Sequence, residues 1–142
     1  MKTASTISRY LLGVIFLVFG LNGFLNFIPA PPPTGVAGQF AGALFVSHYW
    51  IAIISIQLAG GILLLINQFV PLGLTLLGPV IVNILFFHAF MDPSGLPRAA
   101  VVIILWFLAA YNVRSVFAGI LQSKADSFPA RPNPISERAT VR

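Results

Sequence analysis

The sequence contains no cysteine. This absence excludes thiol–disulfide relays, iron–sulfur clusters held by cysteine, and zinc sites built on thiolates. It carries no information about the redox compartment in which the protein resides.

Charged residues are scarce. They make up 8% of the 142 residues, whereas a soluble globular protein has roughly 25%. Hydrophobic residues reach 58%, and the mean hydropathy is +0.94. A water-facing surface cannot be built from so few charges, so lipid is expected to cover much of a single domain.

Most of the few charged residues are basic, which gives a formal net charge of +5. The basic residues are spread along flanks and the C-terminal tail and do not alternate with aromatics, which argues against a nucleic-acid partner. Basic flanks beside apolar helices are explained more simply by membrane topology.

Four apolar segments each approach the roughly 20 helical residues that a bilayer core requires. The first resembles a signal peptide at its start, but its apolar run is longer than a signal core of about 7–15 residues and has no clean cleavage site. We therefore expect an uncleaved first helix. The predicted spans are residues 9–27, 49–66, 71–90 and 97–117.

The connections predict an all-α, four-transmembrane-helix bundle that runs up-down-up-down. Asn67 and Pro71 suit a tight turn between the second and third spans. A turn sequence at residues 92–95 precedes the fourth span. The first connection begins with a proline-rich stretch, and Thr34 can then cap a short helix to about Val46. We expect this helix to lie on the membrane surface in the first outer loop; its glycines leave a mobile loop as the alternative.

The distribution of Lys and Arg predicts the orientation. Seven basic residues flank the first span or end and follow the fourth, and Arg98 alone lies on the other side. The positive-inside rule then places both termini in the cytoplasm. Residues 1–121 are expected to form the transmembrane domain, and residues 122–142 a disordered basic tail.

Polar side chains within the apolar segments must find partners, so they are candidate site residues. All of them fall in the outer half of the predicted bundle. They form either a pocket for a small ligand or quinone headgroup, or interhelical hydrogen bonds that only hold the bundle together. The structural interpretation is favoured because amides do not titrate. The residues are Asn22, Asn26, Gln57, Asn83 and His88.

Further side chains predict local features. His48 and His88 could in principle ligate a metal or haem. Two histidines at the membrane interface are ordinarily just polar residues at the boundary with water, so no metal site is predicted. His88 and Asp92 are spaced to pair on one helix face. Pro79 predicts a bend in the third span.

Small residues predict close helix contacts, either inside the bundle or in an oligomer. They occur at i, i+4 spacing, as adjacent glycines, or on one helix face. They are Gly13, Gly20, Ser55, Ala59, Gly60 and Gly61.

Four stretches of sequence resemble the DoxX-like family of small four-helix membrane proteins. They are residues 9–13 (Arg-Tyr-Leu-Leu-Gly), 19–24 (Phe-Gly-Leu-Asn-Gly-Phe), 57–65 (Gln-Leu-Ala-Gly-Gly-Ile-Leu-Leu-Leu) and 67–72 (Asn-Gln-Phe-Val-Pro-Leu). The resemblance covers about residues 8–120 and implies a multi-pass inner (plasma) membrane protein. Some members are linked to thiosulfate:quinone oxidoreductase or to oxidative-stress complexes. Family members often carry Lys where Gly23 stands and Glu where Gln57 stands. A proton-relay role for that pair therefore does not carry over to this chain.

Two functions follow as hypotheses. The first is a non-catalytic accessory or scaffold subunit of a membrane assembly, without a cofactor; its partners are the lipid bilayer, membrane or peripheral proteins, or further copies of the chain. The alternative is a membrane subunit of a quinone-linked oxidoreductase, with its pocket in the outer polar layer. No catalytic motif is found, which disfavours an enzyme. A small-solute transporter or channel is a weaker third hypothesis, since four helices are few for a transporter without oligomerisation and no inverted repeat is evident.

Overall fold

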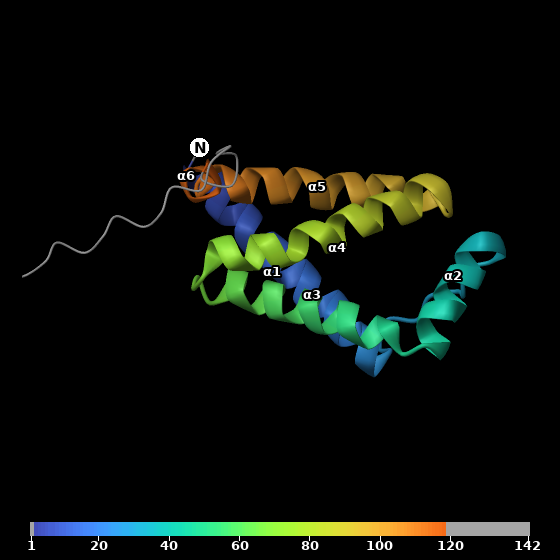
Figure 1. Cartoon of the computed structure of the whole chain (residues 1–142). Helices are drawn as coiled ribbons and strands as arrows, with labels where there is room; N and C mark the ends of the chain where they lie inside the picture. The colour runs from blue at the N-terminus through green and yellow to red at the C-terminus, as the bar shows by residue number, and fades with distance from the viewer. Residues whose placement is uncertain (1, 119–142) are drawn as a thin grey trace, which may run out of the picture.

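The computed structural model describes residues 2–118, and this part of the chain is helical and contains no strand. Figure 1 shows its helices, which short connections join. They are α1 (Lys2–Leu25), α2 (Gly35–Val46), α3 (Tyr49–Leu65), α4 (Val70–Phe90), the 3-10 turn η1 (Pro93–Gly95), α5 (Leu96–Tyr111) and α6 (Arg114–Phe117).

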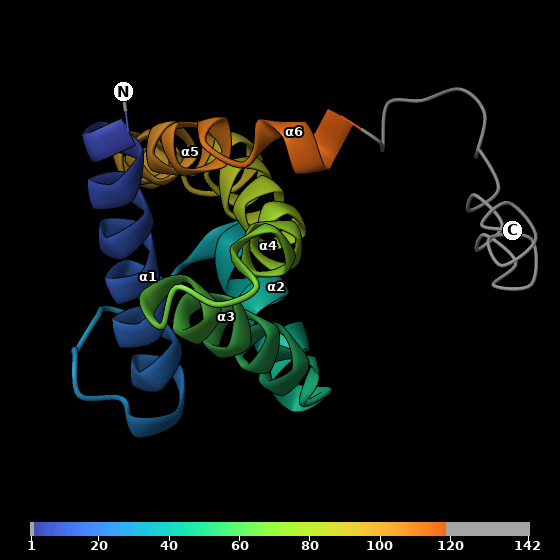
Figure 2. The ribbon, with the colours of Figure 1, turned by 90° about the vertical axis from the view of Figure 1, so that its left-hand side faces the viewer.

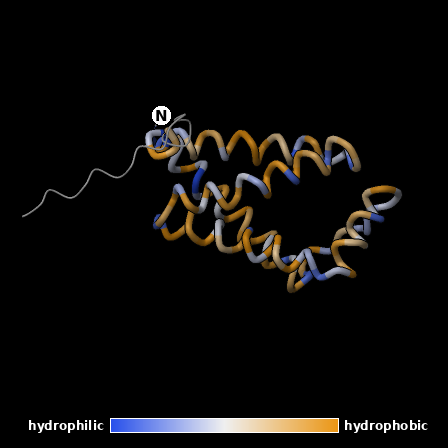
Figure 3. The backbone as a smooth tube through the Cα atoms, viewed as in Figure 1, coloured by the Kyte–Doolittle hydropathy of each residue, from blue (hydrophilic) through white to orange (hydrophobic). Residues whose placement is uncertain are grey.

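Three of these segments are long and apolar enough to cross a membrane: Lys2–Leu25, Val70–Phe90 and Pro93–Tyr111. The 17-residue α3 qualifies only together with α2, from which it is bent by 88°. Figure 3 shows hydrophobic residues along all the long helices. The prediction of an all-helical chain with several apolar segments is confirmed in this form, with three candidate spans, or four if the bent pair counts as one.

The long helices pack in a ring. α1 lies against α3 and α5, and α4 also packs against α3 and α5 (Figure 2). The fully buried side chains lie toward the end that holds the N-terminus and the α3–α4 turn. They are Leu12, Phe16, Leu64, Leu74 and Leu77.

Adjacent glycines let α3 approach two neighbours at once. A Cβ built on Gly61 would lie 3.2 Å from the Gly13 carbonyl oxygen of α1, and one built on Gly60 would lie 3.2 Å from the Gly73 carbonyl oxygen of α4. Any side chain at these positions would push the helices apart. The predicted close contacts are therefore present at the glycines, whereas Ser55 and Ala59 are exposed on another face of α3.

The ends of the first and fourth predicted spans differ from the observed helices. α1 already begins at Lys2, and one face of its polar first turns is buried; the Ser5 hydroxyl, for example, donates to the Ala109 carbonyl oxygen at 3.2 Å. α5 ends at Tyr111, and the Val113 backbone (φ −111°, ψ 14°) separates it from α6. The second and third predicted spans agree with α3 and α4 to within one residue at each end.

The first connection contains the predicted short helix, α2. Thr34 stands at its N-cap position in an extended conformation, without a side-chain capping bond. Its position on the membrane surface stays a prediction, as does the bend at Pro79, which lies within the continuous helix α4. The tail prediction for residues 122–142 falls outside the described residues.

Candidate ligand-binding site

A cavity of about 240 Å³ lies between α2, α3 and α4. It exists because α2 turns away from α3 by 88° and crosses toward α4, where Phe40 packs on Phe87 with ring centroids 5.9 Å apart. Its walls are mostly apolar. The lining residues are Phe40, Ala41, Leu44, Ile53, Gln57, Val80, Asn83, Ile84, Phe87 and His88.

Gln57 is the most deeply placed polar side chain of this cavity, with 9% of its surface exposed. Its Nε2 donates to the Phe16 carbonyl oxygen of α1 at 3.3 Å. This long bond uses one N–H of the amide and leaves the carbonyl oxygen Oε1 as a further acceptor. Gln57 thus joins α3 to α1 and faces the cavity as well.

Asn83 lines the same cavity from α4. Its Nδ2 donates to the Pro79 carbonyl oxygen of its own helix at 3.4 Å, and the side chain is otherwise exposed. Bonds at this distance are weak, so a ligand can replace them at little cost.

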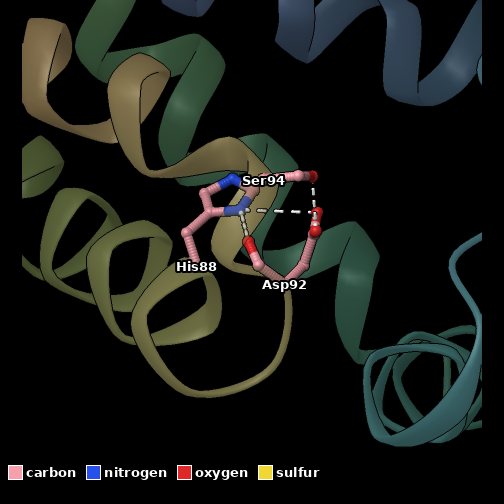
Figure 4. Close-up of polar contacts among 3 residues, drawn as sticks. All are labelled: His88, Asp92 and Ser94. Carbon is pink, nitrogen blue, oxygen red and sulfur yellow. Dashed lines mark hydrogen bonds and ion pairs between the residues drawn. The ribbon is translucent and has the colours of Figure 1, made fainter.

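His88 lies at the loop end of the cavity, and its tautomer follows from its contacts. Nδ1 lies 3.0 Å from the Asp92 carbonyl oxygen, which can only accept a hydrogen bond (Figure 4). Nδ1 therefore carries a proton, and Nε2 is an acceptor whenever the ring is neutral. The Asp92 carboxylate lies 3.6 Å from the same nitrogen, which confirms the predicted i, i+4 pair.

The loop after α4 holds this histidine in place. The Ser94 hydroxyl donates to Asp92 Oδ1 at 2.6 Å (Figure 4), and this bond lowers the pKa of the Asp92 carboxyl. Gly95 lies directly against the imidazole, so that a Cβ there would overlap the ring. The turn residues thus hold the His88 ring in one orientation and keep a proton on its Nδ1 nitrogen.

The other two predicted site residues lie apart from the cavity. Asn22 Oδ1 accepts a bond from the Ile28 backbone nitrogen at 2.6 Å and closes the chain after α1. Asn26 is exposed and adopts the left-handed conformation (φ 49°) that asparagine often takes after a helix. The Asn22 amide is thus used by the local turn, and Asn26 is exposed, so three of the five predicted residues share one cavity and two do not.

Besides the Ser5–Ala109 bond, two further interhelical polar contacts were not predicted from the sequence. Trp106 Nε1 donates to the Leu74 carbonyl oxygen of α4 at 3.0 Å. Arg9 is buried and donates through Nη1 to the Leu64 carbonyl oxygen at 2.8 Å. The burial of Arg9 could have been predicted from its spacing, because Arg9 follows Ser5 by four residues and both lie on one buried face of α1.

Histidines and acids do not gather elsewhere in the described part of the chain. Within residues 2–118 there is no group of three or more His, Cys, Asp or Glu side chains that could hold a metal ion. His48 stands at the start of α3 in a left-handed conformation (φ 59°) and is exposed.

Comparison with known proteins gave no match to a family model, to a curated protein or to a solved structure. The DoxX-like resemblance thus depends on the four sequence stretches alone.

Proposed function

We propose that this chain is a multi-pass membrane protein in which α1, α3, α4 and α5 each cross the bilayer. Large apolar side chains on the outer faces of these helices support the proposal, for example Phe19, Ile62, Phe86 and Phe107. At 1.5 Å per residue α3 is about 25 Å long, slightly less than a hydrocarbon core of about 30 Å. α2 then continues at the outer surface, and both termini lie in the cytoplasm.

The function that the geometry supports best is the binding of a small amphipathic ligand of the quinone-headgroup class in the α2–α3–α4 cavity. A mostly apolar pocket with a few convergent polar groups is the usual form of a small-molecule site. The single observation that carries this proposal is His88, which lines that cavity and whose Nδ1 is bonded to the Asp92 carbonyl oxygen, so that Nε2 is left without a hydrogen-bond partner within residues 2–118. A quinol hydroxyl can donate to Nε2, and the Gln57 and Asn83 amides can donate to a second ligand oxygen.

This binding role fits a subunit of a quinone-linked assembly, in which a partner subunit would carry out the redox chemistry. The DoxX-like resemblance supports the same role and an inner-membrane location.

The test is binding of a short-chain quinol to purified protein in mild detergent. His88→Phe retains a ring beside Gly95 but removes both ring nitrogens, and one lost ligand hydrogen bond of about 1.4 kcal/mol corresponds to roughly tenfold weaker binding. His48→Asn removes the exposed histidine instead and should bind as the wild type does. Wild-type protein that binds no quinol, or equal binding by the wild type and His88→Phe, would refute the proposal.

A second candidate is an accessory or scaffold subunit without a ligand, and one observation favours it. Ser55 and Ala59 form an exposed small-residue pair on α3, flanked by the exposed Ile56 and Ile62. In membranes such pairs allow helices of different chains to approach closely. Ala59→Leu should then release a partner chain that co-purifies in mild detergent, and recovery of the isolated chain as a monomer would count against this candidate.

A further inference from the structure

A second cavity, of about 380 Å³, lies at the end of the bundle that holds the N-terminus and the α3–α4 turn. It is more polar than the α2–α3–α4 cavity. The side chains that matter here are Ser5, Arg9, Tyr10, Asn67 and Asn112.

Arg9 is the central group of this cavity. Only 8% of its surface is exposed, and its guanidinium carbon lies 4.2 Å from the centre of the Tyr10 ring. Its one hydrogen bond within residues 2–118 goes to the Leu64 carbonyl oxygen, in the last turn of α3. That carbonyl belongs to a helix C-terminus, where a cation is favoured. A guanidinium has five N–H donors, so most of its donors remain available to the cavity.

The charge of Arg9 has no carboxylate partner in the described part of the chain. Asp92 is the only acid among residues 2–118, and it pairs with His88 in the loop after α4. The exposed Arg114 stacks on Tyr111 near the same end of α5 and adds a further positive charge. A buried cation that lacks a counter-charge is costly, which points to an anion from outside residues 2–118.

We propose that this cavity binds the phosphate group of an anionic phospholipid headgroup. A guanidinium binds phosphate through two parallel N–H bonds, and the Asn67 and Asn112 amides and the Tyr10 hydroxyl provide further donors. Basic pockets between transmembrane helices on the cytoplasmic side are typical sites for anionic headgroups. The inference depends on the membrane insertion proposed above, but it does not depend on quinone binding at the other end.

The test measures which lipids stay bound to the full-length protein after purification in mild detergent, by native mass spectrometry with added phosphatidylglycerol or phosphatidylcholine. The wild type should retain phosphatidylglycerol in preference to phosphatidylcholine. Arg9→Gln removes a charge-assisted bidentate contact and should reduce that retention by about tenfold or more. Arg98→Gln makes the same charge change on an exposed arginine at the other end of α5 and should retain the lipid as the wild type does.

Further variants separate lipid binding from other roles of Arg9. Asn112→Leu leaves the Arg9–Leu64 bond intact and should also weaken retention, even if Arg9→Gln folds poorly. Equal retention by the wild type, Arg9→Gln and Asn112→Leu would show that Arg9 only caps α3 and would overturn the proposal. A wild type that binds inorganic phosphate but shows no preference for phosphatidylglycerol would overturn the lipid assignment in favour of a soluble anion.

The chain's own remaining acids provide the last control. Asp126→Asn with Glu137→Gln removes every carboxylate side chain beyond the described residues. This double variant should retain phosphatidylglycerol as the wild type does. A large gain in retention would show that a carboxylate of the chain occupies the cavity, and the proposal would be wrong. Lack of membrane insertion would be recognised separately, because the protein would then not float with lipid vesicles in a density gradient.

Discussion

Single residues in the turn between α4 and α5 determine the chemistry of the candidate site. The Asp92 backbone carbonyl sets the His88 tautomer, the Ser94 hydroxyl holds the Asp92 carboxylate, and Gly95 leaves room for the imidazole. Sequence reasoning could predict the His88–Asp92 pair from its spacing. It could not predict that Gly95 packs on the ring, because that contact depends on the path of the turn.

Gly95→Ala should destabilise the protein, because its methyl group would overlap the His88 ring. Overpacking of this kind costs about 1–3 kcal/mol. Gly42 lies within α2, and a Cβ there meets no atom within 4 Å, so Gly42→Ala should be neutral or slightly stabilising. Thermal unfolding in detergent measures both. If the two variants unfold at the same temperature, Gly95 does not support His88.

The Ser94–Asp92 bond predicts a pH dependence in this loop. The pKa of Asp92 is lowered from 3.8 in the folded protein, so the ionised carboxyl stabilises the folded loop above about pH 3.8. This contribution is lost as the pH falls through the lower, folded-state pKa. Ser94→Ala removes the largest cause and should raise the Asp92 pKa toward 3.8, as measured by carbon-13 NMR of labelled aspartate. An unchanged titration in this variant would contradict the assignment.

At the scale of helices, hydropathy and turn residues are sufficient to predict where α3 and α4 begin and end, because these apolar runs are bounded by Asn67, Pro71 and the turn after Phe90. They fail at the start of α1, where Ser5 and Arg9 are polar yet buried, since their partners are carbonyl groups of α5 and α3. Depth along a helix also placed Asn22 in one layer with Gln57 and Asn83. In the structure the Asn22 side chain instead accepts a hydrogen bond from the Ile28 backbone nitrogen at the end of α1. The depth of a residue along a helix does not predict such a bond.

The glycine contacts of α3 lead to a prediction at this scale. Gly61→Leu should separate α1 from α3, because a Cβ there would already lie 3.1 Å from the Leu17 backbone nitrogen. The expected loss of stability is about 1–3 kcal/mol or more. Ala59→Leu introduces the same side chain on an exposed position of the same helix and should cost less. Unfolding in a denaturing detergent compares the two, and equal losses would mean that the glycine contact is unimportant.

For the whole molecule, the two ends of the bundle differ. One end is closed by the buried leucines and by Phe16, with the Arg9 cavity beside them. At the other end α2 extends from the start of α3 at an angle of 88° (Figure 1). Its residues line the cavity that His88 also lines. If the bundle inserts as proposed, the anion site and the quinone site lie on opposite sides of the membrane. This arrangement depends on α3 crossing the bilayer, although its 17 residues qualify as a span only together with α2.

The most direct test of the account is therefore the sidedness of α3. The chain has no cysteine, so single cysteines can be introduced at exposed positions and labelled with an impermeant thiol reagent in intact cells. Thr34→Cys and Ser94→Cys should react from outside, whereas Gln68→Cys and Ser115→Cys should react only after the membrane is permeabilised. Labelling of Thr34→Cys and Gln68→Cys from the same side would show that α3 does not cross the bilayer, and would contradict the four-span account.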